Sequence, residues 1–257
     1  MGLNSLIDIR IKKSGKSNSP FRYAGGKFYA RKLILEQLAP SDYFCEPFAG
    51  GASIFFATKA SYKNNHLNDL DKELINTYTQ IRDNLEGLAN LLDGIPATKE
   101  LHHYYKNEYV AISDLEKAFR WYYLNRTSYS GIMKRENCYW GYGAKYSMKP
   151  ENWVPHLRTV SDNLQGTNLT SIDFERVIDQ APDGGMIFVD PPYYNADQKK
   201  FYTCNFETED HIRLNECLKR NRDRLSFLTT YDNSQEVRDL YSWCQVIEEK
   251  EWNYTIS

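Results

Sequence analysis

The stretch from residue 43 to residue 53, Tyr-Phe-Cys-Glu-Pro-Phe-Ala-Gly-Gly-Ala-Ser, predicts a strand, a tight turn and the start of a helix. Tyr43 to Glu46 reads as a short strand, and Gly50 with Gly51 suits a turn in which the backbone needs freedom. The residues over 53–60 read as the following helix. Glycines at such a junction let a ligand approach the backbone where helix amides point outward. The stretch is therefore the basic unit of an α/β fold.

An acidic residue follows this unit at an informative distance. Asp69 comes nineteen residues after Gly50, at the end of a second predicted strand over 66–69. An acid in that position suits the hydroxyl groups of a ribose, so the pair favours a cofactor that contains a nucleoside. Glycine turns are common in α/β proteins, so an ordinary strand-to-helix turn without a ligand is the better explanation of these residues alone, and the cofactor site stays open beside it.

The rest of the chain repeats the alternation of strands and helices, with one interruption. The sum predicts an α/β fold with an open, mostly parallel sheet and a helical, basic insertion. Four segments follow from this: a mobile start over 1–19, a first half of the sheet over 20–87, the insertion over 88–166 and a second half over 167–257. The predicted helices cover residues 28–38, 53–60, 72–85, 101–109, 115–125, 174–179, 210–221 and 234–241, the predicted strands cover 43–46, 66–69, 169–172, 186–189, 225–230 and 246–252, and residues 128–155 read as irregular.

Composition excludes several classes of protein. The chain has 257 residues, a formal net charge of −2 and 14% aromatic residues, which argues against wholesale disorder. It contains no apolar run near the roughly 20 residues of a membrane helix, and residues 1–19 lack the apolar core of a secretory signal. The five cysteines are widely spaced and form no Cys-x-x-Cys pair. We therefore expect a reduced, cytoplasmic protein without a metal site.

One part of the chain has a clear excess of basic residues. Residues 126–149 carry five basic side chains against a single acid, Glu136, and they are interleaved with tyrosine and tryptophan. Basic groups between aromatic rings suit contacts with phosphates and stacking on bases, although a solvated loop has the same composition. The candidate nucleic-acid contacts in this stretch are Arg126, Tyr129, Lys134 and Arg135.

A second glycine motif lies near the N-terminus. Residues 21–27 read Phe-Arg-Tyr-Ala-Gly-Gly-Lys and precede a predicted helix. A helix N-terminus with a lysine favours a carboxylate or phosphate, and the face of Tyr23 could pack on a planar or sulfonium group. Taken alone, the motif is better explained as an ordinary capped helix.

The most informative motif is Asp190-Pro191-Pro192-Tyr193, directly after the buried strand that ends at Val189. Two prolines fix the backbone and remove two N–H donors, which leaves a carbonyl free to accept from a ligand. Asp190 supplies a second acceptor and Tyr193 a flat surface. Two acceptors beside a stacking ring suit a planar group that carries an NH2, such as the N6 amine of adenine.

With these motifs in place, the chain resembles the Dam-like DNA adenine-N6 methyltransferases, the D12 class or alpha group. In that family the cofactor motifs come first, then a target-recognition insertion, then Asp-Pro-Pro-Tyr. The motifs that carry the resemblance stand in the family's order and together span most of residues 20–252: 21–27, 46–53, Asn68-Asp69-Leu70-Asp71-Lys72-Glu73-Leu74-Ile75, Leu124-Asn125-Arg126, Gly131 and 190–193, with weaker matches at Phe206, His211 and 230–232.

The resemblance implies a Rossmann-like methyltransferase sheet, S-adenosylmethionine as methyl donor and site-specific methylation of an adenine that is flipped out of double-stranded DNA. It implies that the insertion over 88–166 recognises the target, and we expect a monomer. Family members usually continue with an antiparallel closing strand, so we expect a different closure or a shortened chain here. The implied cofactor contacts are Tyr23, Ala24, Gly25, Lys27, Glu46, Phe48, Ala49, Gly50, Asp69 and Asp190, and the implied catalytic residues are Asp190, Pro191, Pro192 and Tyr193.

Two alternatives remain beside this prediction. The first is a methyltransferase that acts on RNA or on an amide nitrogen of protein, which more often carries Asn in place of Asp190. The second is a DNA-binding relative that has lost catalysis, which predicts damaged motifs, whereas the motifs here are intact.

Overall fold

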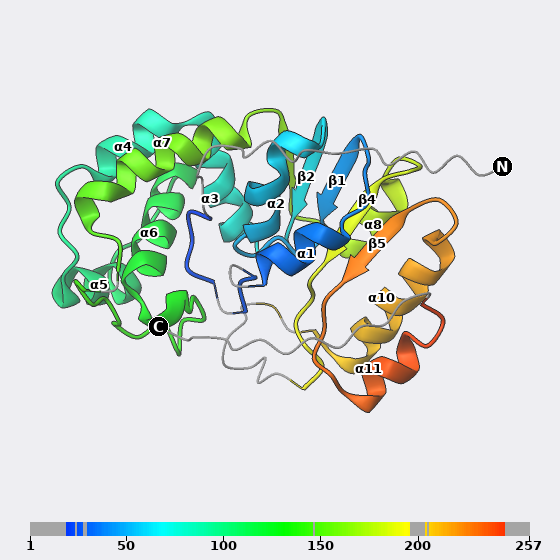
Figure 1. Ribbon diagram of the computed structural model, residues 1–257. Helices are drawn as coiled ribbons and strands as arrows, with labels where there is room; N and C mark the ends of the chain where they lie inside the picture. The colour runs from blue at the N-terminus through cyan, green and yellow to red at the C-terminus, as the bar shows by residue number, and fades with distance from the viewer. Residues whose placement is uncertain are drawn as a thin grey trace.

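The computed structural model describes residues 19–23, 25–27, 30–145, 147–195, 204 and 206–244. At its centre is one sheet of five parallel strands in the order β3-β2-β1-β4-β5 (Figure 1). The predicted open α/β sheet is thereby confirmed. The strands are β1 (Tyr43–Glu46), β2 (Asn64–Asn68), β3 (Thr167–Thr170), β4 (Met186–Val189) and β5 (Ser226–Thr229).

Helices cover both faces of the sheet, because side chains along each strand alternate between two apolar cores. Phe44 and Phe188 belong to the core that α1, α2 and α3 share. Cys45 and Ile187, one residue away, belong to the core that α8 and α10 share. The helices are α1 (Arg31–Gln37), α2 (Ser53–Thr58), α3 (Lys72–Asp83), α4 (Leu85–Leu92), α5 (Lys99–Asn107), α6 (Asp114–Thr127), α7 (Trp153–Leu164), α8 (Phe174–Gln180), α10 (Thr208–Asn221) and α11 (Gln235–Leu240), with short 3-10 turns η1 (Lys59–Ser61), η2 (Tyr129–Gly131) and η3 (Pro150–Asn152).

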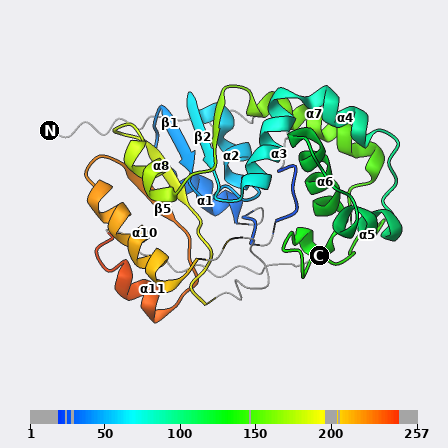
Figure 2. The same ribbon diagram turned by 180° about the vertical axis from the view of Figure 1, so that it is seen from behind.

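Helices α4 to α7 form a group beside the sheet rather than on it, next to α3 (Figure 2). α3 packs directly against α6 and α7. Trp121 and Tyr122 of α6 and Trp153 of α7 are buried in the same apolar core as Phe44 of β1. The core is thus continuous from the sheet into the helical group, and the predicted boundaries at residues 88 and 166 stay a prediction.

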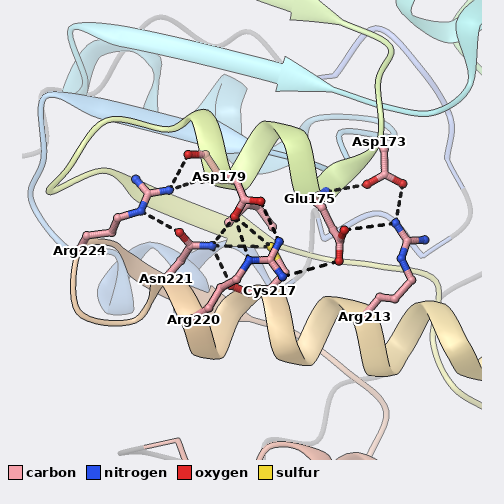
Figure 3. Close-up of polar contacts among 9 residues, drawn as sticks. Asp173, Glu175, Asp179, Arg213, Cys217, Arg220, Asn221 and Arg224 are labelled. Atoms are coloured by element: carbon pink, nitrogen blue, oxygen red, sulfur yellow. Dashed lines mark hydrogen bonds and ion pairs between the residues drawn. The ribbon is translucent and has the colours of Figure 1, made fainter.

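Ion pairs join α8 and α10 on the other face of the sheet (Figure 3). Arg220 donates to both carboxylate oxygens of Asp179, at 3.2 and 2.7 Å. Arg213 donates to Asp173 at 2.9 Å. Arg224, which lies just beyond α10, donates to backbone carbonyl oxygens at the end of α8. These contacts fix the helix pair that packs behind β4.

The predicted elements agree with the structure to within a few residues, and β1 and β4 have the predicted bounds. Two helices were not predicted. α4 is separated from α3 by Asn84 alone, and α7 begins inside the stretch that was interpreted as irregular. The predicted strand over 246–252 lies outside the described residues, as do residues 1–18 of the predicted mobile segment over 1–19. Ser19 is described, and its Oγ donates to the carbonyl oxygen of Phe21 at 3.2 Å. Within the described part of the chain, no helix is long and apolar enough to cross a membrane.

Candidate active site

Three of the predicted site acids lie at one edge of the sheet. β2, β1 and β4 are adjacent strands, and Asp69, Glu46 and Asp190 stand at or directly after their carboxyl ends. The strand order reverses between β1 and β4. In open α/β folds, ligands bind outside the carboxyl edge at such a reversal, so the sheet itself places these acids at the expected site.

Asp69 holds the turn that follows β1. Its Oδ2 accepts a hydrogen bond from the backbone N–H of Gly50 at 2.9 Å, and its Oδ1 accepts from the backbone N–H of Asp71 at 3.0 Å. Burial raises the pKa of Asp69 to about 6, although these hydrogen bonds favour the charged form. Gly50 has a φ of 44°, in the left-handed region that glycine tolerates best. The acid and the glycine that the sequence paired are therefore in direct contact.

The ring of Tyr23 lies against the same turn. A Cβ placed on Gly50 would come within 2.7 Å of Cε1 of Tyr23, so the ring can lie there only because position 50 has no side chain. The hydroxyl of Tyr78 in α3 donates to the Gly50 carbonyl oxygen at 2.9 Å. The turn is thus held from the strand side by Asp69 and from the helix side by Tyr78.

Lys27 is buried beside the carboxylate of Asp190. Its Nζ donates to Oδ2 of Asp190 at 2.6 Å and to the carbonyl oxygen of Gly25 at 2.8 Å. The Lys27 side chain is 3% exposed and that of Asp190 is 19% exposed, so solvent reaches the pair from the carboxylate side. Oδ1 of Asp190 accepts from the hydroxyl of Thr230 at 2.6 Å. Each carboxylate oxygen has further lone-pair capacity for a ligand.

Glu46 faces the same edge but contacts the protein itself. Its Oε1 accepts from the backbone N–H of Phe55 in the first turn of α2, at 2.6 Å, and the residue is 3% exposed. Burial raises the pKa of Glu46 well above its usual value, and the nearby Asp190 carboxylate adds to this shift. The contact that the structure shows for Glu46 is a cap on α2, and its role toward a cofactor stays a prediction.

Aromatic rings surround the residues after Asp190. Lys27 Nζ lies 4.9 Å from the ring centroid of Tyr193. The Tyr193 ring is stacked against Tyr231, with 6.3 Å between centroids, and the Tyr231 hydroxyl is 2.7 Å from Nδ1 of His211. Phe48, after β1, packs against Phe206 with 5.5 Å between centroids. These rings give the edge of the sheet flat apolar surfaces beside its acids.

Thr230 and Tyr231 were not among the predicted site residues. The signal for them in the sequence was the weak family match over 230–232, which names no contact. The predicted cofactor and catalytic residues that the structure brings to this edge are Tyr23, Gly25, Lys27, Glu46, Phe48, Ala49, Gly50, Asp69, Asp190, Pro191, Pro192 and Tyr193, whereas Ala24 lies outside the described residues.

The predicted DNA contacts form a second group at the end of α6 and beyond it. Arg126 is 7% exposed, and its Nε has no hydrogen-bond partner among the described residues. Tyr129 in η2 is 49% exposed. Arg135 is exposed and Lys134 partly so, and within the described ranges neither side chain makes a hydrogen bond or ion pair. These cations are free to meet an anion.

Among the described residues, no cluster of three or more His, Cys, Asp or Glu side chains could hold a metal ion. His102 is instead used within the helical group. Its Nδ1 lies 2.8 Å from the hydroxyl of Thr127, and its Nε2 lies 3.1 Å from the carbonyl oxygen of Cys138. Both ring nitrogens are therefore engaged in fixing the segment after α6.

Comparison with known proteins agrees with this geometry. A model of the D12 class N6 adenine-specific DNA methyltransferase family matches residues 23–256. The Type II methyltransferase M1.LlaDCHI of Lactococcus lactis subsp. cremoris is 27% identical over 89% of this chain and 86% of its own length. The DNA adenine methylase of Escherichia coli (strain K12) is 24% identical over 78% of this chain and 76% of its own.

A DNA N-6-adenine-methyltransferase of Escherichia phage P1 is 29% identical over 87% of this chain, which corresponds to 31% of the phage protein. The family match spans both halves of the sheet and the helical group between them. The motifs around Lys27, Gly50, Asp69 and Asp190 meet at the carboxyl edge of β1, β2 and β4, whereas the motif residues 124–126 and 131 lie in α6 and η2. The chain belongs to the D12 class N6 adenine-specific DNA methyltransferase family.

Proposed function

We propose that this chain transfers a methyl group from S-adenosylmethionine to the N6 amine of an adenine flipped out of double-stranded DNA, acting as a monomer in the cytoplasm. The observation that carries the proposal is the position of Asp190. Its carboxylate is held by Lys27 and Thr230 at the end of β4, across the strand-order reversal from the Asp69–Gly50 contact.

The residues at the carboxyl edge fit the methyl donor. When bound, the donor's sulfonium supplies an electrophilic methyl group. Asp69 would accept hydrogen bonds from its ribose hydroxyls, because the carboxylate has capacity beyond the two backbone bonds that it already accepts. The face of Tyr23 and the backbone of Ala49 and Gly50 would form the wall of the pocket. Lys27 would reach the carboxylate end, and Gly25 and Phe48 would complete the enclosure.

The chemistry assigned to Asp190 is the localisation of a lone pair. The N6 lone pair of adenine is conjugated with the ring and is a poor nucleophile. Acceptors from Asp190 and from the carbonyl of Pro191 would bind the two amine hydrogens and favour a more tetrahedral nitrogen. Tyr193 would stack on the flipped base, and Pro192 would keep the loop rigid. Positioning and preorganised electrostatics supply the acceleration, and no covalent enzyme intermediate is required.

The helical group is proposed to contact DNA. We assign residues 88–166 as the target-recognition part, with Arg126, Tyr129, Lys134 and Arg135 as its contacts. Lys134 and Arg135 have no internal ion pair within the described residues, so they are available to phosphates or base edges. Phosphate contacts of this kind would offset the few kcal/mol that unstacking a base costs.

Labelled methyl transfer tests the proposal. The protein is incubated with methyl-labelled S-adenosylmethionine and, in separate reactions, with duplex DNA, RNA and a protein extract. We expect label in duplex DNA alone, recovered as N6-methyladenine after digestion. Label in RNA or protein instead of DNA would support the alternative substrates and refute the proposal.

Asp190→Asn tests the catalytic assignment in the same assay. The amide keeps the size of the side chain and an acceptor for Thr230 or Lys27, so the fold is expected to persist while turnover drops by at least about a hundredfold. Asp42→Asn is the matched control, since the Asp42 side chain is exposed and, among the described residues, pairs with Lys63 at 3.0 Å. Turnover of the Asp190 variant close to that of the control would show that Asp190 does not act on the amine.

A further inference from the structure

Residues 19–23, here called the strap, lie between the two candidate sites. In both views the strap runs between the α1–α2 side of the sheet and helix α6 of the helical group (Figures 1 and 2). Phe21 is its buried anchor, 6% exposed, with its ring 4.7 Å from the centroids of both Tyr78 in α3 and Trp121 in α6. The strap therefore belongs to the core that joins the sheet and the helical group.

On the cofactor side, the strap packs against the glycine turn after β1. The ring of Tyr23 covers Gly50, where a Cβ would lie 2.7 Å from it. At Gly51, a Cβ would lie 3.2 Å from Cβ of Tyr23 and 3.1 Å from Oγ of Ser19. The turn and the strap are thus in tight contact over two successive glycines.

On the DNA side, the buried side-chain amide of Asn125 forms two hydrogen bonds with the backbone of the strap. The backbone N–H of Arg22 donates to Oδ1 of Asn125 at 3.0 Å, and Nδ2 of Asn125 donates back to the carbonyl oxygen of Arg22 at 2.8 Å. The same Nδ2 lies 3.2 Å from the carbonyl oxygen of Gly131 in η2. Asn125 is fully buried, so these bonds do not compete with solvent. The amide ties the strap and η2 to the same point of α6.

The contact between the strap and η2 leaves no room for independent movement. Gly131 has a φ of 71°, and a Cβ there would come within 2.1 Å of the carbonyl oxygen of Arg22. The guanidinium of Arg22 donates from Nη1 to the carbonyl oxygen of Ser128 at 3.1 Å. A shift of the strap at Tyr23 must therefore be shared by η2, which carries the candidate DNA contact Tyr129.

We propose that the strap links the two binding sites, so that the methyl donor or its product and DNA bind cooperatively, with Asn125 as the positioning residue for the link. The proposal rests on the proposed function, because it needs the donor at Gly50 and DNA at η2. A ligand that fixes Tyr23 against the turn also fixes Arg22 and, through Asn125 and Gly131, the backbone of η2. By linkage, DNA raises the affinity for the donor by the same factor.

The linkage is measured with S-adenosylhomocysteine, the product form of the donor. Its dissociation constant is determined by equilibrium dialysis without DNA and with a saturating duplex that contains every four-base sequence. For the wild-type protein we expect DNA to tighten binding by about fivefold or more. The readout is the ratio of the dissociation constant without DNA to that with DNA. A ratio of one, with both ligands bound, refutes the proposed link through the strap and leaves the proposed function standing. A raised ratio without methyl transfer overturns the proposed function alone.

Gly131→Ala and Asn125→Ala should bring the ratio toward one. The ratio, rather than the affinity without DNA, is the readout, because a shift of Arg22 also reaches Tyr23 at the glycine turn. Gly94→Ala is the matched control, since Gly94 also has a positive φ, 66°, but a Cβ there meets nothing within 4 Å. A wild-type ratio in a folded Gly131 or Asn125 variant contradicts the assigned link.

The wild-type protein gives a measurement that needs no variant. Addition of S-adenosylhomocysteine without DNA should slow backbone hydrogen exchange in residues 128–132, which lie outside the proposed pocket. Residues 85–92 of α4 serve as the internal reference. Exchange in 128–132 that is unaffected by the product overturns the proposal even if both variants fail to fold.

Discussion

At the scale of the residue, two features of its surroundings shift the pKa of Asp69 in opposite directions. Its contacts with the N–H groups of Gly50 and Asp71 stabilise the carboxylate, yet burial outweighs them and raises the pKa of Asp69 to about 6. A proposed acceptor for ribose hydroxyls binds more strongly in its charged form, because hydrogen bonds to a carboxylate are stronger than those to a neutral carboxyl group. The acid is therefore poised so that a small change in pH alters its ability to accept.

We expect the affinity for S-adenosylhomocysteine to fall as the pH drops below about 6, by up to tenfold per unit, because Asp69 becomes protonated. Calorimetry between pH 5 and 8 measures this. Asp69→Asn should bind more weakly, by about 1.5–3 kcal/mol, without that pH dependence. Asp162→Asn, an exposed change on α7, is the control and should keep the wild-type profile. A wild-type affinity that is flat through pH 6 contradicts the role of Asp69.

The contribution of Asp69 to folding has the opposite dependence. Because the pKa of Asp69 is raised in the folded protein, its stabilising contribution is fully present below the pKa of an unfolded aspartate, about 4. That contribution is lost as the pH rises through about 6. The Asp69 side chain thus adds to the free energy of unfolding at low pH and to the affinity for the ligand at high pH.

At the scale of the element, the ion pairs between α8 and α10 show what sequence patterns leave out (Figure 3). Arg224 donates from Nη2 to the carbonyl oxygens of Ile178 and Asp179 at 2.8 and 2.9 Å, and from Nε to Asn221 at 2.7 Å. The last carbonyls of α8 lack partners within the helix. The Ile178 carbonyl accepts from the N–H of the C-cap residue Ala181 at 3.2 Å, and the fork of Arg224 adds a second donor to this end of the helix. The helix pair depends on a side chain that lies outside both helices.

Arg224→Ala should lower the free energy of unfolding by about 1.5–3 kcal/mol, since it removes charge-assisted bonds to half-buried carbonyls. Arg224→Lys should recover only part of this loss, because an ammonium cannot reproduce the fork. Arg222→Ala is the control, as Arg222 is exposed and lies 3.8 Å from Asp223. Urea unfolding followed by circular dichroism gives the three values, and equal losses at positions 222 and 224 would contradict the cap.

The elements themselves were largely predictable where local signals agree. β1 and β4 have apolar runs bounded by a turn, and their predicted bounds match the structure. α7 was missed because Pro155 and the aromatic residues before it suggest irregular structure. Pro155 sits in the first turn of α7, where the missing N–H would have had no partner within the helix.

The site was predictable in part for the same reason. The acids at the ends of β1, β2 and β4 follow from local pattern and from the parallel sheet, which brings strand ends together. The contacts of Asp190 with Thr230 and of Arg22 with Asn125 join residues 40 and 103 positions apart. Such pairs depend on how the elements pack in three dimensions. The sequence motifs indicate that these residues matter, but they do not predict which residue each one contacts.

At the scale of the whole molecule, charge is distributed unevenly. The chain has a formal net charge of −2, so its surface as a whole does not attract DNA. The cations over 126–149 lie in the helical group, and the strap ties the start of this segment to the cofactor side. On the proposed function, affinity for DNA comes from this region, and it should depend on salt as a small number of phosphate contacts does.

Lys134→Ala and Arg135→Ala test this region in a salt titration of DNA binding. The variant that loses a phosphate contact should reduce the slope of log affinity against log salt by about one, for all sequences alike. The variant that loses a base contact should cost about 1–3 kcal/mol at one position of the recognised site. We expect one residue of each kind.

Lys63→Ala is the control for that titration. Lys63 is 77% exposed and directly precedes β2, so it lies at the opposite, amino edge of the sheet. Its loss should leave both the slope and the affinity unchanged. A response at Lys63 equal to that at positions 134 and 135 would mean that DNA binds by general attraction rather than through the helical group.

The strand order has a consequence during synthesis on the ribosome. β1 and β2 are made first, but their outer neighbours β4 and β3 emerge only after the whole helical group. At roughly 5–20 residues per second, about 5–20 s separate the completion of β2 from the arrival of β3. Through that interval the nascent pair has two unpaired edges, the features by which partly folded sheets aggregate.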